Sequence, residues 1–107
     1  MLENEKNILF SVKHDNLIDL LYAFETKHYI VFGLEYCPNG NLYTFLQRVK
    51  TLNEAQARPI MMQILNGLDY LHENNILFRD IKLENILFDN NGRIKITDFG
   101  LSKPDID

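Results

Sequence analysis

The 107-residue chain has little of several features that mark special classes of protein. It holds a single cysteine, Cys37, so an intramolecular disulfide cannot form and a thiolate-rich structural zinc site is excluded. Its longest apolar run, about Tyr29–Leu34, is far shorter than a membrane span, and its first six residues do not read as a secretory leader. The sequence shows neither an internal repeat nor a low-complexity segment. We therefore expect a soluble protein from a reducing, intracellular compartment, the cytoplasm being the simplest assignment.

An excess of basic residues is also missing. The chain has 11 basic and 15 acidic residues, for a formal net charge of −4, and its basic residues do not cluster. This charge gives no general attraction to nucleic acid or to anionic lipid, so we expect neither among the partners. With 46% hydrophobic and 24% charged residues, the composition is that of an ordinary globular domain, and the length allows one domain at most.

The first half of the chain predicts one helix and one hairpin. Apolar residues recur at near-helical spacing from Leu2 to Val12, which indicates a short amphipathic helix. Two runs rich in β-forming residues follow, at 17–24 and 29–34, and the polar loop between them is short enough for a hairpin. The segment 37–41 contains proline, glycine and two asparagines, and therefore predicts a linker between two structural halves.

The second half predicts two helices. The first covers Leu42–Val49, and the second is announced by Asn53 with Gln56 three residues later, a variant of the capping box. Pro59 conflicts with a helix that begins at this cap, so we expect either a kink there or a helix that begins near Pro59. One apolar stripe follows, consisting of Met61, Ile64, Leu65, Leu68 and Leu71.

A second hairpin is predicted near the end of the chain. The apolar run Ile86–Phe88 is followed by a turn over 89–92 and by a second β-like run over 93–96. The turn ends in Asn91-Gly92, and Asn-Gly between apolar runs is a strong hairpin signal because both residues tolerate positive φ.

The segments on either side of this hairpin carry the most informative motifs. They are Phe78-Arg79-Asp80-Ile81-Lys82-Leu83-Glu84-Asn85 before it and Asp98-Phe99-Gly100 after it. Together they resemble the catalytic loop and the metal-binding motif of eukaryotic protein kinases. A lysine at position 82 is typical of serine/threonine kinases. The linker sequence and the aromatic Phe78 resemble the corresponding positions of kinases of the AGC group.

The resemblance extends over essentially the whole chain and implies an α+β, incomplete protein-kinase-like fold. In that fold, residues 1–34 would form a remnant of the small lobe, 35–41 the hinge, and 42–107 the start of the large lobe. The implied activity is transfer of the ATP γ-phosphate to Ser or Thr hydroxyls of a protein substrate, with ATP and Mg²⁺ as cofactors.

The resemblance also assigns roles to individual residues. Asp80 would accept the hydroxyl proton and Lys82 would reach the transferring phosphate, while Asn85 and Asp98 would bind Mg²⁺. These types suit the chemistry, because phosphoryl transfer needs positioning and charge neutralisation, and Mg²⁺ prefers hard oxygen ligands. The two metal ligands flank the hairpin, so two segments could hold the same ions.

Further site residues are implied around the nucleotide. Backbone groups near Glu35 and Cys37 would bond the adenine edge, and Leu87 would lie under the adenine ring, with Leu34 behind it. Leu34 and Leu87 are equally compatible with plain core positions.

Two acidic residues are assigned by the same resemblance. Glu5 falls where the family has a glutamate that pairs with a lysine. Glu84 would bind a basic residue of the substrate. An exposed acidic residue that binds nothing fits this position equally well.

Departures from the family pattern leave a second hypothesis open. Phe78 replaces the usual histidine and Leu83 stands where proline is common. The sequence given also shows no glycine-rich loop, no strand lysine and no activation segment. The alternative is therefore a catalytically inactive kinase fragment or binding module, whose uncovered apolar stripe would favour self-association or chaperone binding.

Overall fold

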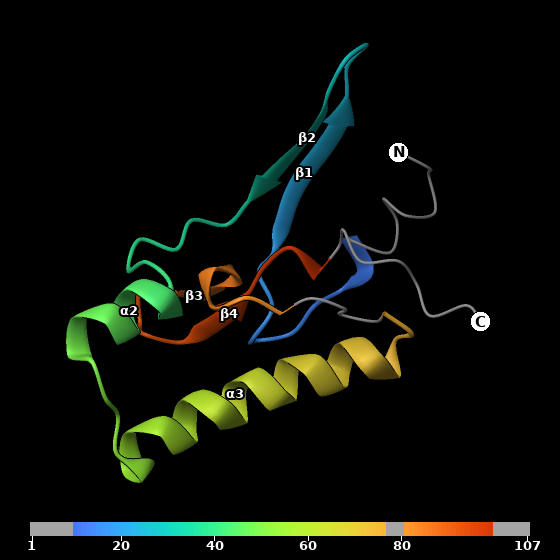
Figure 1. Ribbon diagram of the computed structural model, residues 1–107. Helices are drawn as coiled ribbons and strands as arrows, with labels where there is room; N and C mark the ends of the chain where they lie inside the picture. The colour runs from blue at the N-terminus through green and yellow to red at the C-terminus, as the bar shows by residue number, and fades with distance from the viewer. Residues whose placement is uncertain (1–9, 77–80, 100–107) are drawn as a thin grey trace.

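The computed structural model describes residues 10–76 and 81–99, and these residues include two complete helices and two hairpins (Figure 1). Strands β1 (Leu20–Glu25) and β2 (Ile30–Leu34) pair antiparallel, as do β3 (Ile86–Phe88) and β4 (Ile94–Ile96). The helices are α2 (Leu42–Val49) and α3 (Glu54–Glu73), and a short 3₁₀ turn, η1 (Leu83–Asn85), precedes β3. This mixture confirms the predicted α+β class.

The core lies where α3 packs under β4 and the loop that precedes β1. Ile94 and Ile96 of β4 are 0% and 1% exposed, and Leu17 is 1% exposed. Leu17 bridges Ile96 in parallel, and the amide of Ile18 donates to the carbonyl of Ile96 at 3.0 Å. The loop before β1 therefore extends the β3–β4 ladder. For this reason β1 begins at Leu20, three residues later than the apolar run predicted.

Helix α3 begins at the predicted cap. The side chain of Asn53 accepts from the amide of Gln56 at 2.8 Å, and the side chain of Gln56 accepts from the amide of Asn53 at 3.1 Å. The helix continues through Pro59, so the alternative in which it begins near Pro59 is wrong. Because the capping box satisfies free amides at the helix start, it offsets part of the cost of the interior proline.

The apolar stripe of α3 is buried only along part of its width. Ile64 and Leu71 are buried, but Met61 and Leu65 are 50% and 47% exposed. Gly67 lies against β4: a Cβ added there would be 3.0 Å from Cδ1 of Ile96. A larger residue at position 67 would therefore require its neighbours to shift slightly, whereas the neighbouring face of the stripe remains open.

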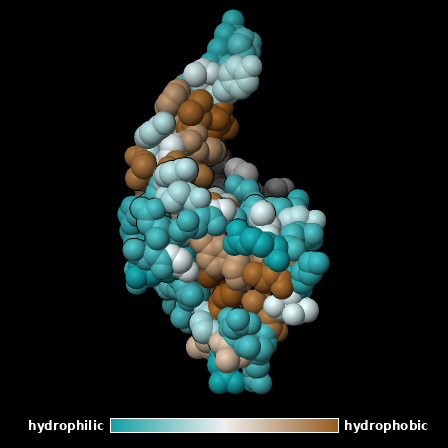
Figure 2. Space-filling view, turned by 90° about the vertical axis from the view of Figure 1, so that its left-hand side faces the viewer, coloured by the Kyte–Doolittle hydropathy of each residue, from teal (hydrophilic) through white to brown (hydrophobic). Residues whose placement is uncertain are grey.

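The β1–β2 hairpin projects from the rest of the chain (Figure 1). Figure 2 shows hydrophobic surface along it, below a hydrophilic tip. Its large exposed apolar side chains are Leu21, Tyr22, Phe24, Tyr29, Ile30 and Leu34. A two-stranded hairpin is marginally stable at best alone in water, so we expect further contacts to cover these exposed faces.

The predicted first helix lies largely outside the described residues. Of the helix predicted from Leu2 to Val12, only Phe10, Ser11 and Val12 are described; Phe10 and Ser11 are helical, and Val12 is not. Neither described helix is long and apolar enough to span a membrane.

Candidate functional site

The predicted metal ligands Asn85 and Asp98 are brought together by the register of the β3–β4 hairpin. Ile86 pairs with Ile96, and the ladder continues outward because the amide of Thr97 donates to the carbonyl of Asn85 at 2.9 Å. Asp98 is therefore one residue beyond the partner of Asn85. Two residues thirteen apart in sequence become neighbours at one end of the hairpin.

The backbone turns the side chain of Asp98 away from the core. Thr97 and Phe99 on either side are buried, at 8% and 5% exposure, whereas Asp98 is exposed. Asp98 has a φ of 67°, in the left-handed region that aspartate tolerates better than most residues. Strained backbone of this kind is common at functional sites and is held in place by its surroundings, here by the buried Phe99.

The chemistry of the pair fits a hard divalent cation. Asn85 is partly exposed, and its amide oxygen and the Asp98 carboxylate are both oxygen donors. Within 10–76 and 81–99, no group of three or more His, Cys, Asp or Glu residues is arranged to hold a metal ion by itself. A site with two protein oxygens suits Mg²⁺, because this ion usually keeps several water ligands and takes phosphate oxygens of the substrate as further ligands.

The predicted catalytic loop is described only from Ile81. Lys82 is exposed and is the residue before η1, and its carbonyl accepts from the amide of Asn85 at 3.0 Å. Glu84 is exposed within the same 3₁₀ turn. Asp80 and Glu5 lie outside the described residues.

The predicted hinge residues lead from β2 to α2 and contact both hairpins. The amide of Glu35 donates to the carbonyl of Asp19 at 3.0 Å, and its Oε1 accepts from the amide of Asp19 at 2.8 Å. The same Oε1 lies 3.7 Å from Nζ of Lys95, whose side chain is only 10% exposed. Leu87, on β3, bridges the linker at Asn41.

Lys95 is a residue of this network that the sequence pattern did not reveal. Between two isoleucines, Lys95 reads as a solvent-facing position of an alternating strand, yet it is 8% exposed. The charge of Glu35 accounts for its burial, because a buried ammonium requires a partner. The pair links the linker to the strand that leads to Asp98.

Cys37 lies next to this network and has a perturbed thiol. Burial raises the pKa of Cys37, and the negative charges of Glu35 and Asp89 raise it further, while Lys95 acts in the opposite direction. The thiol is therefore neutral at pH 7 and a poor nucleophile.

Leu34 lies at the end of β2 and is 41% exposed. The alternative in which Leu34 is a plain core residue is wrong for the described chain. Leu87 is half-buried against the core. This placement suits both a residue under the adenine ring and a plain core residue.

Comparison with known proteins agrees with the motifs. Residues 1–104 match the family described as protein kinase domain. The chain is 46% identical over 102 residues to serine/threonine-protein kinase akt-2 of Caenorhabditis elegans, and 43% identical to RAC-beta serine/threonine-protein kinase B of Xenopus laevis. It is 45% identical to the kinase MST11 of Pyricularia oryzae.

Each of these alignments covers 95% of this chain but only 19%, 21% and 11% of the relative. The chain thus spans about a fifth or less of the length of the curated relatives it matches. The akt and RAC relatives confirm the predicted serine/threonine type and its position near the AGC group. From its motifs, its fold and these similarities, the chain belongs to the protein kinase domain family as a partial domain.

Proposed function

We propose that this chain is the middle of a serine/threonine protein kinase domain and supplies the metal-binding and phosphate-binding part of its active site. The observation that carries the proposal is the hydrogen bond between Thr97 and Asn85, which supports a shared metal site for Asn85 and Asp98. Residues 1–34, 35–41 and 42–107 are the corresponding parts of the small lobe, the hinge and the large lobe.

In the proposed reaction, each residue acts on a defined atom. Asp80 accepts the proton of a substrate Ser or Thr hydroxyl as its oxygen attacks the γ-phosphorus of ATP, and the bond from that phosphorus to the ADP oxygen breaks. Lys82 neutralises charge on the transferred group. Mg²⁺ neutralises charge on the phosphates when it is bound, and Asn85 and Asp98 hold it.

Nucleotide and substrate recognition follow from the remaining assignments. Backbone groups near Glu35 and Cys37 bind the adenine edge above Leu87, and Glu5 fixes its helix through a lysine elsewhere in the kinase. Glu84, which is exposed, attracts a basic residue beside the substrate hydroxyl. The expected partners are intracellular proteins with a Ser or Thr flanked by basic residues.

The alternative, an inactive fragment or binding module, draws its support from the exposed apolar faces of α3 and the β1–β2 hairpin. Such faces favour self-association or chaperone binding when nothing covers them.

Transfer of labelled γ-phosphate to a basic serine peptide distinguishes the two proposals. The chain is assayed with Mg²⁺, alongside Asp98→Asn and the control Asp69→Asn, which changes an exposed aspartate on α3. Transfer that Asp98→Asn abolishes and Asp69→Asn leaves intact supports the enzyme. Transfer absent from all three proteins supports the inactive alternative, and transfer unaffected by Asp98→Asn overturns the proposed role of Asp98.

A further inference from the structure

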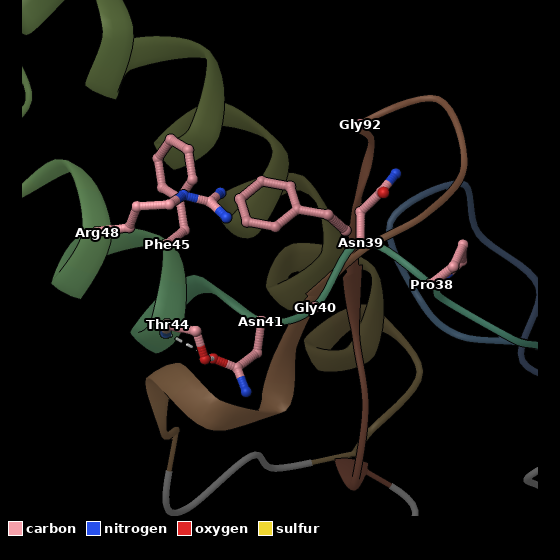
Figure 3. Close-up of a pocket in the computed structure, with 9 residues that line it drawn as sticks. Pro38, Asn39, Gly40, Asn41, Thr44, Phe45, Arg48 and Gly92 are labelled. Carbon is pink, nitrogen blue, oxygen red and sulfur yellow. Dashed lines mark hydrogen bonds between the residues drawn. The ribbon is translucent and has the colours of Figure 1, made fainter.

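A pocket outside the proposed catalytic site lies between the linker, α2 and the β3–β4 turn. It has a volume of about 610 Å³. Figure 3 shows its lining, which consists of Pro38, Asn39, Gly40, Asn41, Thr44, Phe45, Arg48, Phe88 and Gly92. None of the residues assigned to adenine, phosphate or metal lines it, so it is separate from the proposed catalytic site.

The pocket has an apolar wall with one cation beside it. The rings of Phe45 and Phe88 are tilted by 59° with centroids 5.3 Å apart. The guanidinium carbon of Arg48 lies 5.7 Å from the centre of the Phe45 ring (Figure 3). Within the described part of the chain, no carboxylate pairs with Arg48, so its planar donors are open to an anion.

The polar groups of the lining offer mainly donors. Oδ1 of Asn41 already accepts from the amide and the hydroxyl of Thr44, at 2.8 and 2.9 Å. Its Nδ2 makes no hydrogen bond among the residues described, so two further N–H donors remain. Asn39 donates to the carbonyl of Asp89 at 2.7 Å, which leaves its own oxygen as an acceptor. The lining therefore suits a ligand with a carboxylate and a backbone N–H.

The linker wall of the pocket is held in place by the strand behind it. The amide of Phe88 donates to the carbonyl of Gly40 at 2.9 Å, and Asn41 bridges Leu87. A wall fixed by backbone hydrogen bonds loses little conformational freedom when a ligand binds.

The shape favours a segment of a protein over a small molecule. Six of the nine lining residues, Pro38, Asn39, Gly40, Thr44, Arg48 and Gly92, are exposed. Small-molecule sites usually enclose most of their ligand, which this open lining does not do. Asn41 and Arg48 stand at opposite ends of α2, about 10 Å apart along the helix axis, a distance that about three extended residues span.

We propose that this pocket, here called the α2 pocket, docks an extended peptide segment of a partner protein in which an acidic residue stands next to apolar ones. The acidic side chain pairs with Arg48, and an apolar side chain packs against Phe45 and Phe88. The amide of Asn41 and the oxygen of Asn39 bond the peptide backbone. This docking goes beyond phosphoryl transfer, because it uses no residue of the proposed active site.

Fluorescence polarisation with a labelled, capped peptide of sequence GELFG tests the proposal, with GQLFG as its neutral counterpart. The full chain is compared with Arg48→Met, which keeps an unbranched apolar stem but removes the charge. The matched control is Arg58→Met, at an exposed arginine of α3 that pairs with Glu54. Circular dichroism establishes that both variants keep the helical content of the parent.

We expect GELFG to bind the chain and the Arg58→Met variant equally, and to bind Arg48→Met about tenfold more weakly, as loss of one charge-assisted hydrogen-bonded contact implies. GQLFG should bind the parent chain about tenfold more weakly than GELFG does. On Arg48→Met the two peptides should bind equally. Equal binding of GELFG to Arg48→Met, or no saturable binding up to about 1 mM, overturns the proposal. If 3-phenylpropionate alone binds as tightly as GELFG, the pocket takes small carboxylates and the peptide assignment is wrong.

Discussion

The side chain of Asn16 joins three segments, and its removal provides a quantitative test of the packing that supports the site. Asn16 is 6% exposed, and its Nδ2 donates at 3.1 Å both to the carbonyl of Ile94 on β4 and to Oε1 of Gln63 on α3. Gln63 Oε1 also accepts from the amide of Ile94 at 2.9 Å. The variant Asn16→Ala removes both side-chain bonds but keeps the backbone bond from Ile96 to Asn16.

Two lost hydrogen bonds at about 1 kcal/mol each predict that Asn16→Ala lowers the free energy of unfolding by about 2 kcal/mol. For a chain of this size the midpoint of thermal unfolding should fall by roughly 8–16 °C. Gln63→Met should cost a similar amount, because Oε1 accepts two part-buried bonds, while the bond that Nε2 donates to the carbonyl of Pro59 is exposed to water and adds little. The double variant should cost about 3 kcal/mol rather than 4, since the two single changes remove one shared bond.

Urea unfolding followed by circular dichroism measures these free energies, with Asn66→Ala on the exposed face of α3 as the control. The control should change the free energy of unfolding by less than about 0.5 kcal/mol. An Asn16→Ala variant as stable as this control would refute the reasoning, and so would strict additivity of Asn16→Ala and Gln63→Met.

Three further predictions concern the linker and the helix cap. Glu35→Gln should destabilise the chain by about 1 kcal/mol, because Lys95 stays buried but loses its counter-charge. A double-mutant cycle with Lys95→Met measures the coupling energy between the two side chains, and a value of zero would contradict the ion pair. The raised pKa of Cys37 predicts that its alkylation by iodoacetamide rises with pH later than that of a free cysteine; a midpoint at or below the free value would contradict the burial argument. Asn53→Ala should lower the unfolding free energy by about 1 kcal/mol in the same urea assay, and an unchanged value would mean that the capping box adds nothing.

The features predicted correctly from the sequence depend on short-range chemistry. The capping box of α3 needs only Asn53 and Gln56, three residues apart, and both of its hydrogen bonds form as expected. The β3–β4 hairpin follows from two apolar runs around a turn in which Gly92 adopts a φ of 78°. Since Asn85 and Asp98 flank that hairpin, their proximity was also within reach of the sequence.

The features that the sequence did not predict depend on contacts between distant residues. Asn16 and Gln63 are 47 positions apart, and neither is unusual in its local pattern. The burial of Lys95 depends on Glu35, sixty residues earlier. The start of β1 shifted because Leu17 pairs with β4 instead of β2, a choice that hydrophobic periodicity does not encode.

The account rests most directly on the claim that Asn85 and Asp98 hold the same metal ion with a nucleotide, and Mn²⁺ binding tests it. Mn²⁺ is titrated by electron paramagnetic resonance with a non-hydrolysable ATP analogue and the chain, Asn85→Ala, Asp98→Asn or the double variant. We predict that each single variant weakens Mn²⁺ binding by about tenfold or more and that the double variant adds little, because both changes disrupt one site. Independent, additive effects of the two substitutions, or Mn²⁺ binding unchanged by both, would contradict the account.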